Sequence, residues 1–396
     1  MPGALEGIRV LDVGLLVQGP QAGLLLADMG ADVIKVELPE MGDHARWIVI
    51  SEDDLRGVYF HANNRGKRSV TIDLRTASGV DIFKRLAADA DVVISNFKPG
   101  TMESWGVGYD DLKAINPGII WGAGSTFGPV GPDSDREGAD LAGQAAGGLV
   151  STIGHDGEPP TPVGATIADH CASQNLAAGV LAALVSRGRT GEGQRVDVSL
   201  LGGQIWAQAS EYTHYLLTGE VPGRGTYGHP LLRGLYGLFQ TQDGWIGIIG
   251  VPLDDQDAFF IAIDQPELAL DPRYQGLLAS REDMRELFAR LNPVFATKTT
   301  AEWGEIFTKA GVRWAPVRDY SEVAQDAGAW ENGYFQKLDD GRGGEVAVVP
   351  APITMTGTPL VPSGWLPELG EHTDEVLQGA GYSAGDIARF RAEGAV

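Results

Sequence analysis

The chain opens with short apolar runs that alternate with amphipathic segments. Residues 8–13, IRVLDV, are rich in β-branched side chains and are bounded by Gly7 and Gly14. A helical pattern follows, with Pro20 suited to a first turn and Gly30 suited to the end of the helix. A second apolar run at 31–37 completes a β–α–β unit.

The same rhythm continues through the first half of the chain. The pattern predicts further strands at 69–74, 91–96, 118–124 and 195–201, and helices near 77–88, near 109–115 and from Asp169 to about 186. Strands that alternate with helices in this way are typical of an α/β domain with a parallel sheet covered by helices on both faces.

The character of the chain changes near residue 222. Residues 222–237 are rich in Gly and Pro and predict a linker or loop, and 238–250 predict a hairpin around Gln242-Asp243-Gly244. Helices are expected near 253–264, 280–291 and 300–310, which indicates a second, smaller α+β unit. Helical spacing returns in the tail at 369–394.

Composition narrows the classes of partner. The 396 residues carry 53 acids against 30 Lys and Arg, a formal net charge of −23, which argues against a nucleic-acid or anionic-membrane partner. The longest apolar stretch, 176–185, is about half of a membrane span. Cys171 is the single cysteine and the N-terminus lacks the pattern of a secretory signal, so we expect a cytoplasmic protein without an intramolecular disulfide.

Three stretches of the first half are candidates for ligand contacts. The first turn, GLLVQGPQAG at 14–23, lacks G-x-G-x-x-G and contains Pro20, so a nicotinamide or flavin site is not favoured. The basic segment 63–75, with Arg65, Lys67, Arg68 and Arg75, is either a phosphate clamp or a solvated loop. Residues 94–100, ISNFKPG, end a strand with a ring for stacking and a cation for phosphate, or simply enter a Pro-Gly turn.

Asp169 is the only acid in the run 164–180, GATIADHCASQNLAAGV. One interpretation is a helix N-cap, for which Asp is well suited. The other is a covalent nucleophile, whose ionised form a helix N-terminus favours. His170 and Cys171 lie in the same turn, but neighbours in a helix point in different directions and do not form a nucleophile–base pair.

Taken together, several motifs over nearly the whole chain resemble the family III CoA-transferases. This is the CaiB/BaiF group, which includes formyl-CoA transferases and shares its superfamily with the α-methylacyl-CoA racemases. The segments that carry the resemblance are 7–37, 64–74, 93–100, the GEPPTPVG stretch at 157–164, 168–200 and LGEHTDEVL at 369–377.

The resemblance implies a fold and an assembly. A Rossmann-like large domain would comprise 1–205 and 335–396, with a small domain at 225–325 and linkers at 206–224 and 326–334. Two chains would interlock as a homodimer.

It also implies a chemistry. Asp169 would be the catalytic aspartate, with Gln18 and Asp140 in support, no metal and no tightly bound cofactor. An acyl-CoA thioester and a carboxylic acid would be the substrates. Contacts with CoA are expected at Val17, Gln18, Ile72, Arg75, Asn96, Phe97, Lys98, Arg136 and Glu137, and a substrate pocket is expected at Trp47, Tyr227, Gly228 and His229.

Two alternatives stay open beside CoA transfer. A racemase of this fold uses the His of a Gly-His-Asp motif, but the matching stretch reads Gly138-Ala139-Asp140, and Gly154-His155-Asp156 lies in a polar loop. A non-catalytic CoA-binding protein is the other. The displaced Gln18, Leu38 in place of a base and the short glycine run at 223–229 disfavour formate or oxalate. A larger or more apolar acyl group is suggested by Trp47, Tyr227, His229 and Leu232.

Overall fold

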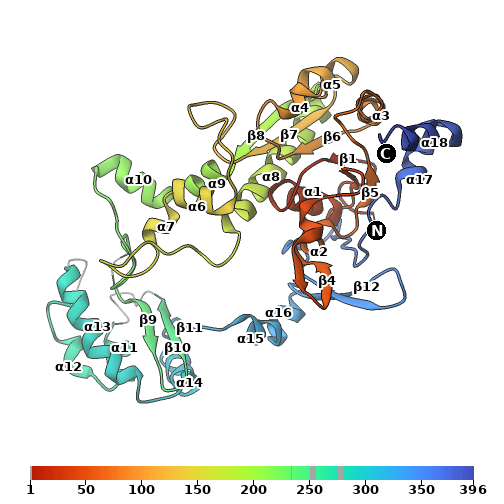
Figure 1. Ribbon diagram of the computed structural model, residues 1–396. Coiled ribbons are helices and arrows are strands. Elements are labelled where there is room, and N and C mark those ends of the chain that lie inside the picture. Colours follow the sequence, from red (N-terminus) through yellow and green to blue (C-terminus); the bar gives the residue numbers. More distant parts are fainter. Residues whose placement is uncertain (1, 233, 250–255, 275–279) are drawn as a thin grey trace. The chain divides into compact units, whose positions relative to one another are not determined.

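The computed structural model describes residues 2–232, 234–249, 256–274 and 280–396. It divides the chain into two compact units (Figure 1). The first comprises residues 1–147, 164–207 and 327–396, and the second comprises 148–163 and 208–326. The segment 148–163, which the sequence analysis assigns to the large domain, therefore clusters with the second unit.

A six-stranded parallel sheet organises the first unit, in the order β5-β2-β1-β6-β7-β8. This confirms the predicted α/β class. The strands are β1 (Arg9–Asp12), β2 (Asp32–Glu37), β5 (Arg68–Thr71), β6 (Val92–Ser95), β7 (Ile120–Ser125) and β8 (Arg195–Ser199). Two hairpins add β3 (Val49–Ser51) with β4 (Asp54–Gly57), and β12 (Gln336–Asp339) with β13 (Glu345–Val348).

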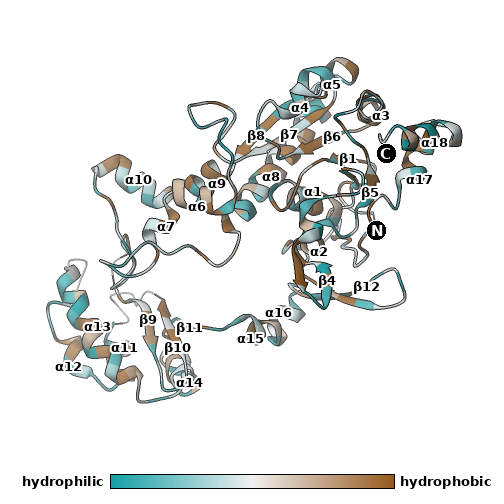
Figure 2. Ribbon diagram, in the orientation of Figure 1, coloured by the Kyte–Doolittle hydropathy of each residue, from teal (hydrophilic) through white to brown (hydrophobic). Residues whose placement is uncertain are grey.

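Helices cover both faces of the sheet. The larger core joins the sheet to α3 (Ala77–Ala88), α5 (Tyr109–Ile115), α17 (Thr373–Gly379) and α18 (Ala384–Ala392), through side chains such as Phe83, Leu112, Leu377 and Phe390. On the other face, α1 (Gln18–Asp28) and α8 (Ile167–Thr190) bury Leu26, Leu176 and Val180 against the strands. The strands are brown with apolar residues in Figure 2, as burial on both faces requires.

The chain reverses its direction of travel across the sheet between β1 and β6. Strands β2 and β5 follow on one side of β1, and β6, β7 and β8 follow on the other. The carboxyl ends of β1 and β6 thus border a crevice at a topological switch point, which is where open α/β sheets bind ligands. Asn96, just after β6, holds the loop after β1, since its side chain accepts from Leu15 N at 2.7 Å and donates to Leu15 O at 2.9 Å.

Three helices beside this edge pack unusually closely. They are α6 (Asp140–Ala146), α8 and α9 (Leu200–Ala207). A Cβ on Gly143 would lie 2.7 Å from Leu200 Cβ and 2.9 Å from Ala168 Cβ, so only glycine fits where α6 meets the other two. This contact brings the start of α6 to the start of α8.

Short elements complete the first unit. They are the 3-10 helix η1 (His44–Trp47), α2 (Val58–Asn64), α4 (Thr101–Ser104) and α16 (Ala327–Glu331). The tail returns to β5, where Thr71 N donates to Thr373 Oγ1 at 3.1 Å.

The second unit is a small α+β body. Strands β9 (Tyr236–Gln240), β10 (Trp245–Ile249) and β11 (Trp314–Pro316) form an antiparallel sheet, and its core is rich in aromatic rings such as Phe239, Phe259, Phe295, Trp303 and Phe307. Its helices are α7 (Leu149–Thr152), α10 (Ala209–Thr218), α11 (Gln256–Ala262), α12 (Pro266–Ala269), α13 (Arg281–Phe295), α14 (Thr300–Ala310) and α15 (Tyr320–Ala324).

The predicted linkers differ from the structure. Residues 206–224 contain the end of α9 and all of α10, and 326–334 contain α16. Helix α10 escaped prediction because Leu216 and Leu217 are about four-fifths exposed, so its apolar residues do not form a buried stripe. The start of the helix expected at 253–264 and the end of the hairpin expected at 238–250 fall outside the described residues. Within the part of the chain that the structure describes, no helix is long and apolar enough to span a membrane.

Candidate active site

Asp169 lies in the first turn of α8, half-buried, and it is not the cap of that helix. The capping hydrogen bonds come instead from Asp140, whose Oδ1 accepts from Ala168 N at 2.7 Å and from Asp169 N at 3.2 Å. The N-cap interpretation of Asp169 is therefore wrong. The side chain of Asp169 is therefore available for a role other than capping α8.

Asp140 is itself held in place. Its Oδ2 accepts a hydrogen bond from Gln144 Nε2 at 2.6 Å, one turn further along α6. The same Nε2 also donates to Ala165 O at 3.2 Å, in the segment that leads into α8. Two carboxylates from different helices thus lie close together, and Asp140 is held by an amide and by two backbone N–H groups, all of them neutral.

This arrangement shifts the ionisation of Asp169. Burial, with a smaller contribution from the negative charge of Asp140, raises the pKa of Asp169 from 3.8 to about 7. The helix N-terminus does not overcome these effects. Asp169 is therefore a weaker acid than an ordinary aspartic acid, and its ionised form is correspondingly more basic.

His170 and Cys171, the other potentially reactive residues of this turn, are less suited to act as a nucleophile or base. His170 Nδ1 lies 2.6 Å from Gln21 Oε1, and Nε2 lies 3.3 Å from Thr166 Oγ1. Because a carbonyl oxygen only accepts, Nδ1 carries the proton and Nε2 accepts from the threonine. Burial also lowers the pKa of His170 and raises the pKa of the Cys171 thiol, so neither group is a ready nucleophile or base.

The start of α1 packs beside the start of α8. Ser173 Oγ donates to Gln18 O at 2.8 Å and to Asp169 O at 2.7 Å, which ties the two helices together. Gln18 is buried, and its Nε2 donates to Ser125 O at 3.2 Å. The structure therefore brings Gln18, Asp169 and Asp140 into one region of the first unit.

The loop between β1 and α1 is fixed by three side chains. Gly14, Leu15 and Leu16 donate their N–H groups to Asp12 at 2.9 Å, Asn96 at 2.7 Å and Asp43 at 2.9 Å. Leu16 adopts φ +63°, which a non-glycine residue rarely does and which is a form of strain common at functional sites.

Beneath this loop lies a buried ionic network. Lys35 pairs with Asp43 at 2.8 Å, and Lys67 pairs with Asp12 at 2.7 Å, all four side chains being fully buried. Lys35 also donates to Gly14 O, and Lys67 donates to Pro20 O at 2.7 Å. The network joins both ends of the loop to the strands beneath it.

The basic segment 63–75 is therefore not an open phosphate clamp. Lys67 belongs to the network, and Arg65 is buried in a two-pronged pair with Asp28, both contacts at 2.6 Å. Arg68 pairs with Asp32. Arg75 is exposed and binds Asp73 at 2.7 Å, so it is the member of the segment that reaches solvent most freely.

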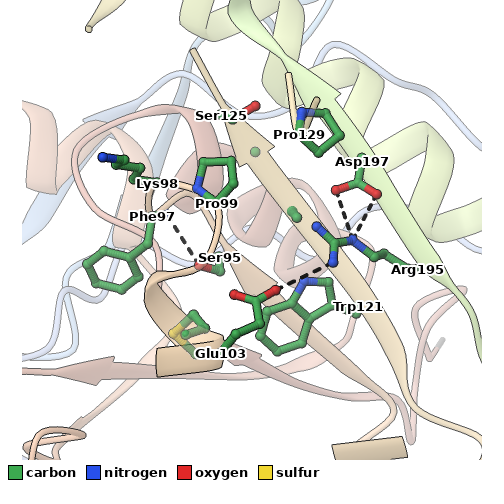
Figure 3. A pocket seen from close by; sticks show the side chains of 13 residues that line it. Ser95, Phe97, Lys98, Pro99, Glu103, Trp121, Ser125, Pro129, Arg195 and Asp197 are labelled. Carbon is green, nitrogen blue, oxygen red and sulfur yellow. Dashed lines mark hydrogen bonds and ion pairs between the residues drawn. The ribbon is translucent and has the colours of Figure 1, made fainter. Parts of the chain in front are cut away.

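Other residues predicted to contact CoA follow the carboxyl edge of the sheet. Phe97 and Lys98 line a small cavity, of about 20 Å³, along β6, β7 and β8 (Figure 3). Phe97 packs edge-on against Trp105 with ring centroids 5.3 Å apart, and Lys98 is 43% exposed. A volume of this size holds one water molecule, so an adenine ring does not fit unless these side chains move.

The remaining predicted CoA residues are dispersed. Arg136 and Glu137 are exposed on the loop before Asp140, and Arg136 stacks over Phe127. Val17 and Ile72 are buried, at 3% and 2% exposure, so their side chains fill the core. Asn96, as described, is committed to the β1 loop.

The predicted substrate-pocket residues belong to different units. Trp47 is an exposed residue of the first unit, with Nε1 donating to Met41 O at 2.7 Å. Tyr227, Gly228 and His229 belong to the second. There His229 Nδ1 accepts from Leu231 N and Leu232 N, and Nε2 lies 3.8 Å from Glu211.

Sequence reasoning missed Gln144 and the ionic network. A glutamine four residues after Asp140 is a visible signal, because i and i+4 lie on one face of a helix. The network had no comparable signal, since its members come from separate strands and loops. Among the described residues, no cluster of His, Cys, Asp and Glu could hold a metal ion.

Comparison with known proteins gives a consistent result. A model of CoA-transferase family III matches residues 5–373. The chain is 35% identical over 393 residues to the succinyl-CoA:mesaconate CoA-transferase of Haloarcula hispanica, covering 97% of this chain and 98% of that protein. It is 34% identical over 388 residues to the succinate–glutarate CoA-transferase of Agrobacterium fabrum, covering 94% of each.

The fold has a matching solved structure. The crystal structure of a CAIB/BAIF family protein from Brucella suis superposes with a TM-score of 0.84 at 31% identity, and the match covers 96% of this chain and 100% of that one.

Proposed function

The chain belongs to CoA-transferase family III, and we propose that it moves CoA from an acyl-CoA thioester to a carboxylic acid through covalent intermediates on Asp169. The observation that carries the proposal is the state of Asp169. It is half-buried in the first turn of α8, relieved of capping by Asp140, and has a pKa raised to about 7.

The first half-reaction transfers CoA to the enzyme. An oxygen of ionised Asp169 attacks the donor thioester carbonyl, the C–S bond breaks, and CoA leaves as a thiolate. The product is a mixed anhydride between the donor acid and Asp169. The thiolate then attacks the aspartyl carbonyl and releases the donor as a free carboxylate, which leaves an aspartyl-CoA thioester.

The second half-reaction runs these steps in reverse with the acceptor acid. Its carboxylate attacks the aspartyl thioester and expels the CoA thiolate, and the thiolate attacks the acceptor carbonyl of the new anhydride. A new acyl-CoA leaves and Asp169 is regenerated. Because each bond broken is replaced by one of similar energy, the cycle needs neither ATP nor a tightly bound cofactor.

Each attack creates an oxyanion that needs hydrogen-bond donors. The N–H groups of residues 14–16 are already bonded to side chains, so they do not serve. We assign this role to the backbone at 17–19 or to the glycine-rich loop at 223–228. Val17 and Gln18 contribute to CoA binding through this backbone.

The remaining expected contacts form part of the proposal. Asn96, Phe97 and Lys98 border the nucleotide of CoA at the switch-point edge, with Ile72, Arg75, Arg136 and Glu137 further along that edge. Trp47, Tyr227, Gly228 and His229 enclose the acyl group. We also propose the interlocked homodimer and the cytoplasmic location that the sequence analysis expects.

Nothing in the described site favours a racemase. That reaction needs a second acid/base on the opposite face of the α-carbon, and position 139 is alanine. His155, the imidazole of the other Gly-His-Asp sequence, is exposed in a loop of the second unit.

Trapping the acyl-enzyme tests the mechanism. The enzyme is incubated with succinyl-CoA, as a probe donor, and hydroxylamine, and then digested and sequenced by mass spectrometry. We expect a hydroxamate on Asp169, and none in Asp169→Asn. A hydroxamate on another residue, or steady CoA transfer by Asp169→Asn, would show that the mechanism is wrong.

The acceptor is identified by a separate screen. The wild-type enzyme is given succinyl-CoA and a panel of mono- and dicarboxylic acids, and new acyl-CoA esters are separated by chromatography. In the same mixtures, deuterium from heavy water should not enter the α-carbon of a 2-methylacyl-CoA. Entry of deuterium without transfer of CoA would favour the racemase, and binding of CoA without either reaction would favour the non-catalytic alternative.

A further inference from the structure

Gln144 is almost wholly buried, with 1% of its surface exposed, in a helix composed mainly of small apolar residues. A buried amide is costly unless its polar atoms are bonded. Here Nε2 donates hydrogen bonds to Asp140 Oδ2 at 2.6 Å and to Ala165 O at 3.2 Å. Asp140 bonds to the backbone N–H of Asp169, and Ala165 lies in the segment that leads into α8.

Asp140 passes this restraint to the backbone of Asp169. While Gln144 holds Oδ2, Oδ1 accepts from the N–H groups of Ala168 and Asp169. A carboxylate held through one oxygen cannot rotate without breaking the contacts of the other. The direction of the first turn of α8 is therefore linked to the side chain of Gln144.

We propose that Gln144 is a positioning residue of the CoA-transfer reaction, which fixes the ionised Asp140 against the backbone of Asp169 without adding a positive charge. The inference rests on the proposed role of Asp169 as the nucleophile. It goes beyond that role because it assigns a function to an uncharged side chain that touches neither substrate nor the reacting oxygen.

The choice of an amide is the key to this assignment. Lys or Arg at 144 would also hold Asp140, but its positive charge would cancel the negative charge that Asp169 experiences. Among the residues that the structure describes, the charge that acts on Asp169 is that of Asp140 on α6, and His170 and Cys171 are its titratable neighbours on α8. From α1, the neighbouring side chains Gln18 and Gln21 are neutral. A neutral donor at 144 preserves an uncompensated pair of acids.

Two substitutions of Gln144 separate positioning from mere packing. Gln144→Leu keeps most of the volume and removes the donor, and we expect kcat to fall roughly 10- to 100-fold, because small misplacements at a reacting centre have effects of this size. The KM for acyl-CoA should change by less than about threefold, since CoA is not contacted.

Gln144→Glu gives the sharper test, because it changes the pH profile. While protonated, Glu at this position donates to Asp140 as the amide does, and activity is retained. When it ionises, it repels Asp140 and raises the pKa of Asp169. We expect kcat/KM to rise and then fall with pH, where the wild-type profile rises to a plateau.

The matched control is Gln174→Glu, at an exposed position of α8. It adds the same charge to the unit and should leave the shape of the profile unchanged. If Gln144→Glu has the wild-type shape, or if Gln144→Leu keeps kcat within about twofold, the positioning role of Gln144 is wrong. If Gln144→Leu does not fold, the nearly isosteric Gln144→Glu still decides.

A readout without turnover separates this inference from the proposed function. The difference in unfolding free energy between Asp169 and Asp169→Asn, followed against pH, reports the pKa of Asp169. In the Gln144→Glu background its midpoint should move to higher pH. An unmoved midpoint would overturn the inference even if CoA transfer is demonstrated, whereas absence of transfer with a moved midpoint would count against the function alone.

Discussion

The first unit holds two pairs of carboxylates, one fully buried and one half-buried, and their charged surroundings differ. Beneath the loop after β1, Asp12 and Asp43 are each paired with a lysine at 2.7–2.8 Å. At the start of α8, Asp140 accepts from the backbone N–H of Asp169, and the side-chain partner of Asp140 is a glutamine. Lysines neutralise Asp12 and Asp43, whereas the side-chain partner of Asp140 is a neutral amide.

The pKa values follow this difference. Burial alone would raise the pKa of Asp43, but the charge of Lys35 and the N–H groups of Ala45 and Leu16 outweigh it, and the pKa is lowered. Burial raises the pKa of Asp169 to about 7, and the charge of Asp140 acts in the same direction. An acid left without compensation in this way reduces stability and is typical of a reacting group.

The largest expected effect comes from Asp169→Asn. Removing the nucleophile should lower CoA transfer by at least roughly a thousandfold. The same change should stabilise the protein, because the raised pKa of Asp169 means that the folded state resists ionisation of this carboxyl. In the wild type, the resulting loss of stability begins above pH 4 and is complete above about pH 7.

The gain from Asp169→Asn at pH 8 should therefore be on the order of 2–4 kcal/mol and should vanish near pH 4. Urea unfolding at the two pH values measures it. A loss of stability at pH 8 would mean that Asp169 is a structural residue like the acids of the network.

The network should respond in the opposite direction. Asp43→Asn removes the acid that forms an ion pair with Lys35 and a charged acceptor of the Leu16 and Ala45 amides, so we expect a loss of about 3–5 kcal/mol in unfolding free energy. Urea unfolding at pH 7 tests this.

The double variant Lys35→Met Asp43→Asn is the control for Asp43→Asn. It removes the stranded charge and should lose less than the sum of the two single variants, since the two residues are in contact. Additive losses would show that the pair is not a coupled unit.

The next smaller effect is on pH dependence. Because only ionised Asp169 attacks, kcat/KM should rise through an apparent pKa of about 7 and level off above it. Asp140→Asn removes the like charge but keeps an oxygen for the α8 amides, so its profile should shift to lower pH. A shift to higher pH would exclude like-charge repulsion as a contributor.

The order of strands and helices in the first unit was largely readable from the sequence. Residues 9–12, 32–37 and 92–95 are short apolar runs separated by amphipathic stretches, and a parallel sheet demands this pattern. Helix α10 was not readable, since its exposed leucines follow no buried stripe. The grouping of 148–163 with 208–326 depends on contacts between distant segments, which local patterns do not encode.

For the site, the sequence pointed to Asp169 but assigned the cap to the wrong residue. Ala168 and Asp169 receive their capping bonds from a residue 28 and 29 positions away, and no rule of local spacing reveals that. In the same way, Arg65 and Lys67 looked like phosphate ligands because their partners Asp28 and Asp12 lie on other elements. The residue types could be read from the sequence, whereas the partner of each charged side chain could be identified only from the fold.

The smallest expected effect concerns two exposed arginines with the same local geometry. Arg75 binds Asp73 and Arg56 binds Asp54, each two residues back, and both side chains are more than half exposed. Neither substitution by Ala should change unfolding measurably, unlike changes in the network.

If Arg75 meets a phosphate of CoA, Arg75→Ala should raise the KM for acyl-CoA by about two- to fivefold at low salt, and the difference should shrink as salt screens the contact. Arg56→Ala should leave the KM unchanged, because Arg56 lies in the hairpin strand β4 and not at the carboxyl edge of the parallel sheet. Equal KM values for the two variants, measured with succinyl-CoA at low and high salt, would remove Arg75 from the CoA site and leave it as a surface ion pair.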